Sequence, residues 1–367
     1  MKTKRRAPRA RLAAIGVATS CALFVAGCGA ANEGGGGGAD SGISGTISGA
    51  GASSQQAAMQ AWIAGFTGAN SGATVNYDPV GSGGGRTQFI QGGQIAFAGS
   101  DAYLKDEQLA QARQRCGGQV IEVPNYISPI AAVYKLDGVQ NLNLSPATIA
   151  GLFKGDIKTW NDPKVAADNP GVALPATTVT PVHRSDESGT TENFTDFMNK
   201  AAPSVWTAEG DGEWPVPGGE AAQGTSGVVG AVGQGNGTIG YADASQAGQL
   251  SKANLKLGDQ NVAPTAEAAA KILEESKRVE GQGPTSFAFD LNRTSTGGAY
   301  PIVLASYLIA CPQYPDQAQA DTVKAFLSYV VSEQGQQAAA QAAGSAPLSA
   351  ALRGQITPVI DQIKVGG

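Results

Sequence analysis

A strand-to-helix junction in the middle of this 367-residue chain constrains its fold more than any other segment. The apolar run 179–182 precedes the polar segment 183–191, and apolar residues then return at helical spacing at Phe194, Phe197 and Met198. This pattern predicts a strand, a loop and a helix. A helix N-terminus has unpaired N–H groups and a partial positive charge, so the junction is suited to holding an anion.

The loop of this junction also supplies side-chain donors. Arg184 offers a forked guanidinium that is always charged, and Ser188, Gly189 and Thr190 offer hydroxyls and a glycine amide within a few residues. Donors of this kind, gathered before a helix, are typical of a site for an oxyanion. The sequence therefore predicts a bound oxyanion here.

Strand and helix patterns alternate along the rest of the chain. Apolar or β-branched runs typical of strands occur at 45–50, 74–80, 95–99, 120–123, 131–134, 238–241 and 302–310. Helical spacing occurs at 59–66, 149–153 and 323–331, and the Ala/Gln-rich stretch 336–343 is also predicted to be helical. This alternation indicates an α/β sheet fold.

Further polar junctions follow predicted strands, at the strand ends where open α/β sheets hold their ligands. Two of them are rich in glycine and serine, at 49–54 and 80–85, and a third, at 99–101, carries a carboxylate. Glycine lets the backbone turn and direct its N–H groups toward a ligand. A glycine/serine cluster such as 81–85 is, taken alone, most often an ordinary turn, and arginine at position 86 excludes a dinucleotide motif.

Asp101 is unusual beside a bound anion, because its carboxylate repels a fully deprotonated ligand. Phosphate near neutral pH keeps an O–H to donate, whereas sulfate has none. An acceptor-only carboxylate therefore favours phosphate and disfavours sulfate, and a buried polar group left unpaired costs roughly 1–3 kcal/mol. The alternative is that Asp101 caps a helix ahead of Leu104 and Leu109.

The N-terminal segment predicts export. Six basic residues accompany an apolar run of 15 residues at 12–26, which is short for a membrane span and typical of a signal peptide. The run ends in Val-Ala-Gly-Cys28, which resembles a bacterial lipobox, with residues 1–27 removed and Cys28 lipidated. The alternative is an ordinary signal peptide with a chance cysteine. The glycine-rich segment 28–42 is typical of a flexible tether.

Composition then excludes several classes of function. The mature chain from Cys28 would have 340 residues, enough for two lobes, and losing six basic residues changes the formal net charge from −5 to about −11. Such an acidic chain argues against a nucleic-acid partner. The single histidine, His183, and few cysteines cannot form a typical zinc set, so we expect no metal and no cofactor.

A hydrolase is also disfavoured. Neighbours along a strand face opposite sides, so His183 should point away from the site that Arg184 serves. The chain contains no Gly-x-Ser-x-Gly nucleophile motif. We therefore expect a protein that is not an enzyme.

Two cysteines remain for a disulfide once Cys21 leaves with the signal peptide and Cys28 takes the lipid. Exported proteins commonly contain disulfides, so Cys116 and Cys311 are predicted to be bonded to each other. Two buried thiols are the alternative.

Four motifs, taken in order, resemble those of the PstS family, the phosphate-binding lipoproteins or periplasmic proteins of phosphate ABC importers. Family motifs of the types GAGAT, GSSGG, GASD and RxDxSGT are matched at 49–53, 81–85, 98–101 and 184–190, and a late Gly-x-Ala-Pro-Leu element at 344–348. The resemblance spans nearly the whole mature chain, and four ordered motifs are far more specific than any single one.

The resemblance implies a set of phosphate ligands at the matching positions. The implied donors are Ser53, Ser54, Ser82, Arg184, Ser188, Gly189 and Thr190, and the implied acceptor of the phosphate proton is Asp101. Asp186 would orient Arg184, with an exposed loop carboxylate as the alternative. Two departures stand out: Ser53-Ser54 replaces the common Thr-Phe, and Gly83 replaces a second serine.

The resemblance also implies a two-lobed, type II periplasmic-binding-protein-like fold with the ligand cleft between lobes linked by crossing strands. Lobe 1 would comprise residues 43–130 and 302–367, and lobe 2 residues 131–301. The expected protein is a monomer, lipid-anchored to the outer face of the bacterial cell membrane, which closes around inorganic phosphate and delivers it to the permease subunits of an ABC importer. The alternatives are a binding protein for sulfate, molybdate or phosphonate, and a signalling or adhesion lipoprotein without transport.

Overall fold

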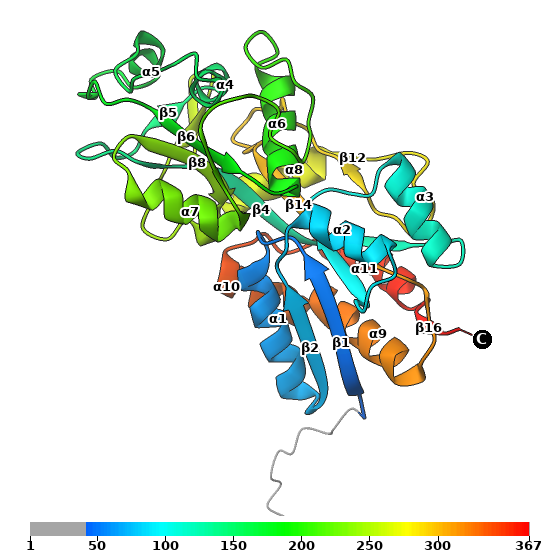
Figure 1. Cartoon of the computed structure of the whole chain (residues 1–367). Helices are drawn as coiled ribbons and strands as arrows, with labels where there is room; N and C mark the ends of the chain where they lie inside the picture. The colour runs from blue at the N-terminus through cyan, green and yellow to red at the C-terminus, as the bar shows by residue number, and fades with distance from the viewer. Residues whose placement is uncertain (1–41, 367) are drawn as a thin grey trace, which may run out of the picture. The chain divides into compact units, whose positions relative to one another are not determined.

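The computed structural model describes residues 42–366. The predicted signal peptide, the lipidation site Cys28 and the tether up to residue 41 lie outside the described residues. Within the described range, none of the helices has the length and apolar character needed to cross a bilayer. Helices and strands alternate along much of this range (Figure 1), in agreement with the predicted α/β class.

The helices and strands have the following bounds. The helices are α1 (Gln56–Ala69), α2 (Ser82–Ile90), α3 (Asp106–Arg115), α4 (Pro146–Lys154), α5 (Pro163–Asp168), α6 (Gly189–Ala201), α7 (Gly224–Gln234), α8 (Ala266–Glu275), α9 (Gln317–Val331), α10 (Glu333–Ala343) and α11 (Ala350–Ile360), with the short 3₁₀ helix η1 (Ala244–Gln246). The strands are β1 (Ser44–Gly51), β2 (Gly72–Asp78), β3 (Phe97–Ser100), β4 (Ile121–Lys135), β5 (Asn143–Leu144), β6 (Thr180–Arg184), β7 (Glu220–Ala222), β8 (Thr238–Asp243), β9 (Ser251–Lys252), β10 (Asn254–Leu257), β11 (Gln260–Val262), β12 (Lys277–Arg278), β13 (Phe289–Asp290), β14 (Val303–Ala310), β15 (Gln313–Tyr314) and β16 (Lys364–Val365).

One nine-stranded sheet organises the described residues. Its strand order is β2-β1-β3-β14-β4-β8-β6-β7, and β9 pairs with β4 beside it. β1 runs parallel to β2 and β3, whereas β14 is antiparallel to both of its neighbours, β3 and β4. This order brings β14 between β3 and β4, two strands that precede it by more than 150 residues.

The long strand β4 belongs to both halves of this sheet. Residues 121–129 pair with β14, and residues 130–135 pair with β8. The apolar runs 120–123 and 131–134 are therefore parts of one strand, and it is buried almost throughout. We call β2, β1, β3, β14 and the first part of β4 the first half-sheet, and the rest of β4 with β8, β6 and β7 the second half-sheet.

Aromatic and aliphatic side chains pack helices onto each half-sheet. In the first half-sheet, Phe326 of α9 packs on Phe97 of β3, with ring centroids 5.5 Å apart. In the second, Val228 and Val232 of α7 cover β8 so closely that a Cβ on Gly240 would lie within 2.9 Å of both side chains. Close packing of this kind fixes the sheet relative to the helices whose ends approach the ligand site.

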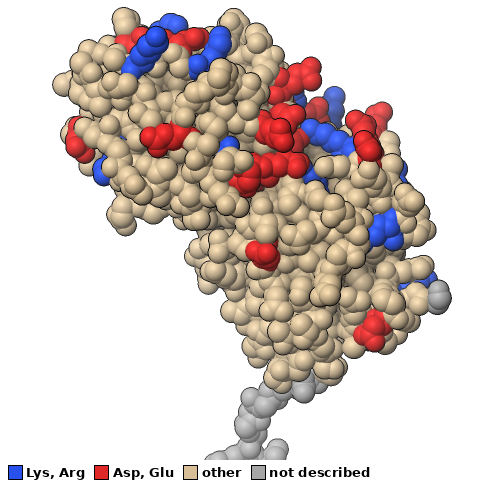
Figure 2. Space-filling model, viewed as in Figure 1, with Lys and Arg blue, Asp and Glu red and all other residues tan. Residues whose placement is uncertain are grey.

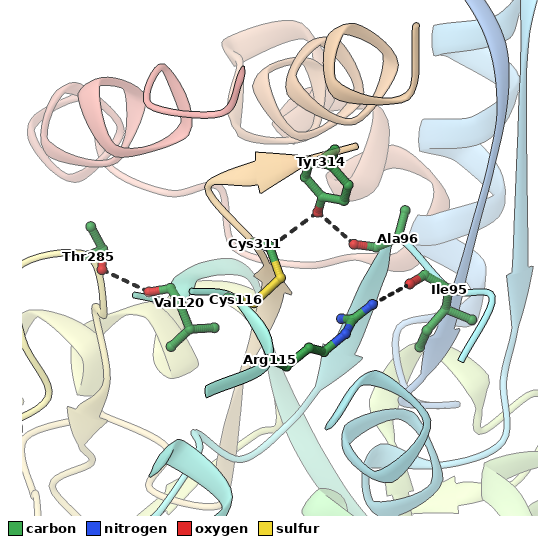
Figure 3. The surroundings of a disulfide bond; sticks show 8 residues. All are labelled: Ile95, Ala96, Arg115, Cys116, Val120, Thr285, Cys311 and Tyr314. Carbon is green, nitrogen blue, oxygen red and sulfur yellow. Dashed lines mark hydrogen bonds between the residues drawn. A yellow bond between two sulfur atoms is a disulfide. The ribbon is translucent and has the colours of Figure 1, made fainter. Parts of the chain in front are cut away.

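The predicted disulfide is confirmed. It joins Cys116, at the C-terminus of α3, to Cys311, just after β14, with Cα atoms 5.0 Å apart (Figure 3). Beside it, the Tyr314 hydroxyl donates to the carbonyl of Ala96 (2.7 Å) and accepts from the Cys311 N–H (3.2 Å). The bond and these contacts tie the end of α3 to the central strands.

Candidate functional site

The polar junctions predicted from the sequence meet in one place, and backbone hydrogen bonds join them. The N–H of Ala52 donates to Gly99 (2.9 Å) and that of Gly81 donates to Gly51 (2.9 Å), which unites the three junctions of the first half-sheet. The N–H of Gly83 donates to the carbonyl of Glu187 (3.3 Å), in the loop between β6 and α6. Segments more than a hundred residues apart in sequence thus form a single site.

Asp101, directly after β3, is only 2% exposed, and its carboxylate accepts hydrogen bonds from hydroxyls. The donors are Ser54 (2.7 Å to each oxygen), Thr190 (2.8 Å) and Ser306 (2.6 Å). No ion pair within residues 42–366 includes Asp101. The helix-cap alternative is wrong, because α3 begins only at Asp106 and its N-cap residue is Lys105.

Ser306 is a site residue that the sequence analysis did not identify. It lies in the middle of the apolar strand β14, where the pairing with β4 changes register between Ser306 and Tyr307. Irregularities of this kind redirect a side chain, and here the Ser306 hydroxyl reaches Asp101. The available signal was one serine in an otherwise apolar run.

Arg184, at the end of β6, is 3% exposed and forms a forked pair with Asp186. Its Nε donates to Oδ1 (2.8 Å) and its Nη2 donates to Oδ2, while the N–H of Gly224 adds a bond to Oδ1 (2.9 Å). Burial raises the pKa of Asp186, but the hydrogen bonds and charge of Arg184 outweigh burial and hold this pKa below its ordinary value. Asp186, with its side chain 15% exposed, is thus not an exposed loop carboxylate.

The start of α6 packs directly against Asp101. Ser188 caps the helix by accepting from the N–H of Thr191 (3.2 Å), and Thr190 donates to the Asp101 carboxylate. A Cβ on Gly189 would lie 2.8 Å from the Cβ of Asp101, so only glycine allows this approach. The positive end of the helix therefore adjoins the candidate proton acceptor.

The remaining predicted donors come from the first half-sheet. Ser82 accepts from the N–H of Asp101 (3.1 Å), and it begins α2, so the glycines after it lie in a helical turn rather than in the loop that the sequence indicated. Ser53 shares a hydrogen bond with the hydroxyl of Thr225 (3.1 Å), at the start of α7. Thr225 was not predicted, because its contact with Ser53 spans 172 residues of sequence.

His183 points away from Asp101, as expected, and packs on an aromatic side chain. Its ring stacks on Trp214, with centroids 5.0 Å apart and planes 9° apart, and its Nδ1 contacts the carbonyl of Arg184. Across residues 42–366, no group of three or more His, Cys, Asp or Glu side chains has the arrangement needed for a metal ion.

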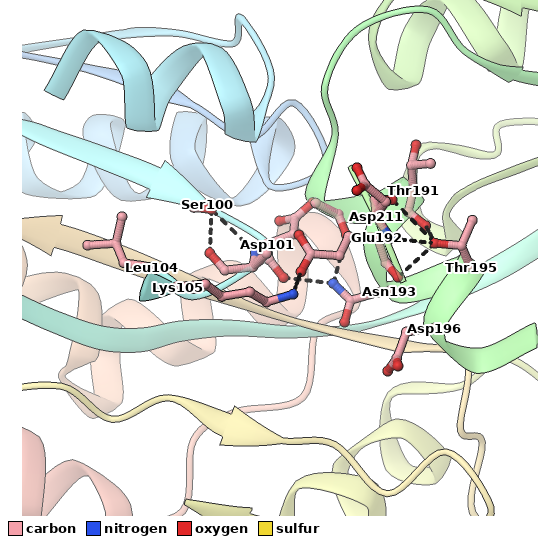
Figure 4. Close-up of polar contacts among 12 residues, drawn as sticks. Ser100, Asp101, Leu104, Lys105, Thr191, Glu192, Asn193, Thr195, Asp196 and Asp211 are labelled. Atoms are coloured by element: carbon pink, nitrogen blue, oxygen red, sulfur yellow. Dashed lines mark hydrogen bonds and ion pairs between the residues drawn. The ribbon is translucent and has the colours of Figure 1, made fainter. Parts of the chain in front are cut away.

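A cavity of about 90 Å³ adjoins Asp101, bordered by the loop 101–105, α6 and β14, and Asp101 is the one predicted ligand that lines it. Charged side chains of both signs gather in this region on the face shown in Figure 2. Figure 4 shows Lys105 reaching Glu192, and Asn193 donating to the Asp101 carbonyl (2.7 Å). With forked, backbone and hydroxyl donors and one acceptor carboxylate, the site can hold a tetrahedral oxyanion that carries a proton.

Comparison with known proteins places the chain in a family. A model described as the PBP superfamily domain matches residues 37–334. Phosphate-binding protein PstS 3 of Mycobacterium leprae is 36% identical over 334 residues, covering 87% of this chain and 90% of the relative. Phosphate-binding protein PstS of Xylella fastidiosa is 32% identical over 301 residues, covering 80% and 79% of the two chains.

Solved structures share the fold. A high-affinity periplasmic phosphate-binding protein bound with phosphate is 22% identical, with a TM-score of 0.71, and covers 88% of this chain and 100% of its own. The phosphate-binding protein of Stenotrophomonas maltophilia is 20% identical, with a TM-score of 0.66, covering 86% and 93%. The predicted two-lobed periplasmic-binding-protein-like fold is thereby confirmed.

Proposed function

We propose that this chain, which belongs to the PstS family of the PBP superfamily, binds inorganic phosphate and delivers it to the permease of an ABC importer. One observation carries the proposal. Within residues 42–366 the carboxylate of buried Asp101 accepts hydrogen bonds only from hydroxyls, close to a helix N-terminus and to a buried arginine whose charge is balanced by Asp186. Such a site binds an anion that can donate a proton more favourably than one that cannot. The relatives named as phosphate-binding proteins support the same ligand.

The proposed ligand set is the one implied by the resemblance. Phosphate oxygens accept from Ser53, Ser54, Ser82, Arg184, Ser188, Gly189 and Thr190, and Asp101 accepts the phosphate O–H. The hydroxyls of Ser54 and Thr190, which bond Asp101, can rotate to donate to an anion that enters between them. Ser306 stays behind Asp101 and holds its carboxylate.

Two lobes would close around this ligand. We assign residues 43–130 and 302–367 to lobe 1 and residues 131–301 to lobe 2, because β4 passes from one half-sheet to the other at residue 130. Asp101 then comes from lobe 1 and Arg184 from lobe 2. A ligand that bonds both lobes stabilises the closed form by its higher affinity for that form, and the closed form is what a permease can recognise.

We also propose that the protein is a binding protein and not an enzyme, and that it acts as a monomer anchored through Cys28 to the outer face of the bacterial cell membrane. The signal-peptide pattern, the lipobox-like segment and the glycine-rich tether support this location. Replacing Cys28 by alanine should release the protein from membranes. Continued lipid labelling of that variant would contradict the anchor.

Titration calorimetry of the mature protein, freed of bound ligand, tests the proposed function. We expect tight binding of phosphate at neutral pH and no response to sulfate. Comparable binding of both anions would favour a general oxyanion-binding protein. A folded protein that responds to neither would overturn the proposal, and the motifs would then serve only the scaffold.

A further inference from the structure

Arg86 of α2 connects two parts of the site that lie far apart in sequence. The side chain is 4% exposed, and its Nη1 donates to the Ser100 hydroxyl (2.8 Å). Its Nη2 forms an ion pair with Oε1 of Glu187 (2.6 Å). Ser100 immediately precedes Asp101, and Glu187 immediately precedes Ser188. One guanidinium therefore joins the residue before the candidate proton acceptor to the residue before the cap of α6.

The local sequence of α2 makes room for this contact. Glu187 lies over the first turn of α2, where the N–H of Gly83 donates to its carbonyl (3.3 Å). A Cβ on Gly83 would lie 2.2 Å from Oε2 of Glu187 and 2.5 Å from its Cβ. The glycine that replaces the family's second serine is thus the residue that permits Glu187 to reach Arg86.

We propose that Arg86 and Glu187 form a latch that keeps the site closed and lengthens the time for which the anion stays bound. The inference rests on the proposed function and its two lobes. α2 lies in lobe 1 and Glu187 lies in lobe 2, so the pair exists only while the lobes are together. The guanidinium of Arg86 has two side-chain partners, Ser100 and Glu187, and when the lobes open it keeps Ser100 alone of these two.

The burial of Arg86 distinguishes this pair from an ordinary surface ion pair. In the Arg86–Glu187 pair the cation is 4% exposed and the carboxylate 38%. Lys105 and Glu192 (Figure 4) also bridge the proposed lobes, but there the cation is 47% exposed, and both residues line the cavity beside Asp101. Exposed pairs are screened by water and salt, whereas a buried partner strengthens the attraction. Lys105→Met is therefore the matched control.

The test measures the dissociation rate and the affinity of inorganic phosphate with the detergent-solubilised mature protein. We expect Arg86→Met and Glu187→Gln each to raise the dissociation rate about tenfold, with little change in association. The double variant should dissociate no faster than the faster single variant. Lys105→Met should change the rate less than twofold.

A second pair of variants tests the latch even if Arg86→Met fails to fold. Gly83→Ala should displace Glu187 and speed dissociation, and adding Gly83→Ala to Glu187→Gly should have no further effect, because every side-chain atom that the new Cβ would strike, the Cβ of Glu187 included, is then absent. An unchanged dissociation rate in Glu187→Gln, or additive effects in the double variants, would overturn the latch. An unmutated protein that binds no phosphate would overturn the proposed function as well.

Discussion

Two aspartates in the candidate site, the buried Asp101 and the partly buried Asp186, have opposite kinds of partner. Asp186, after β6, accepts both donors of the Arg184 fork and a backbone N–H. Asp101, after β3, accepts hydrogen bonds from three hydroxyls and takes part in no ion pair of the described residues. An aspartate side chain therefore balances a cation at position 186, whereas at position 101 it supplies an acceptor whose charge is balanced by no cation of the described residues.

This difference explains how the site can attract anions and also select among them. Asp186 fixes the plane of the guanidinium and offsets part of its charge, so Arg184 alone does not make the site accept every anion. Asp101 then disfavours ligands that cannot donate a proton. Attraction thus comes from Arg184, which Asp186 orients, and discrimination comes from Asp101, so each can be removed independently.

The largest expected effect follows from removing the cation. Arg184→Met leaves the partly buried Asp186 without its partner, which should lower the free energy of unfolding by roughly 3 kcal/mol, the lower end for a buried pair. Loss of a charged hydrogen bond should also weaken phosphate binding by at least about 1.5–3 kcal/mol. Urea unfolding and calorimetric titration measure the two effects.

A compensating change separates these two roles of Arg184. Combining Arg184→Met with Asp186→Leu removes the unpaired carboxylate and should restore most of the stability but not the affinity. Wild-type affinity in Arg184→Met would show that Arg184 does not contact the ligand.

A third carboxyl group, the fully buried Glu122 of β4, extends the comparison to the pH dependence of stability. Burial raises its pKa to about 7, although Ser286 (2.7 Å) and the N–H of Leu104 (2.6 Å) donate to it. A pKa that is higher in the folded than in the unfolded state means that folding favours the protonated form. Stability should therefore decline by about 3 kcal/mol as pH rises from about 4.5 to 7.

Glu122→Gln should remove this decline, because the amide does not titrate. The contribution of Asp186 to stability has the opposite pH dependence. Because its pKa is lowered in the folded state, it adds stability that is fully present above the unfolded-state pKa near 4 and is lost as pH falls through the folded-state pKa. Denaturant midpoints of wild type and Glu122→Gln at pH 5 and pH 8 measure how much of the pH dependence of stability comes from Glu122. Parallel pH profiles for wild type and Glu122→Gln would contradict the assignment.

The next largest expected effect is on the preference for phosphate over sulfate, when the acceptor Asp101 is changed. Asp101→Asn keeps the size of the side chain but presents an amide that can donate as well as accept. We expect the preference for phosphate over sulfate to fall about 10- to 100-fold, the scale of one buried unpaired acceptor. Competition titrations give the ratio, and Asp186→Asn is the control, since it should weaken both anions alike. An unchanged ratio in Asp101→Asn would refute the role given to Asp101.

The smallest expected effect is that of the hydroxyl behind Asp101. Ser306→Ala removes one of its three donors, so phosphate binding should weaken by about 1 kcal/mol, the usual value for one hydrogen bond. Ser306→Thr should recover most of that loss. A reduction as large as that of Asp101→Asn would mean that Ser306 contacts the ligand itself.

The positions of the candidate ligands were predictable because each lies in a short segment with a local signal. Glycine and hydroxyl residues follow apolar runs at 49–54, 80–85 and 184–191, and strand ends in an α/β sheet face the ligand. Ser306, Thr225 and the Arg86–Glu187 pair had no comparable signal. Their contacts span 205, 172 and 101 residues, so they depend on which strands become neighbours.

The sequence by itself determined the α/β class, the order of the polar junctions and the pairing of Cys116 with Cys311 as the two cysteines left for a disulfide. These features rest on periodicity, composition and motif order, which are local properties. Tertiary structure alone decided that β14 lies between β3 and β4, that β4 serves both half-sheets, and that Glu187 fills the space over Gly83. Strand order and side-chain packing are set by long-range burial and hydrogen bonding, and no pattern of neighbouring residues encodes them.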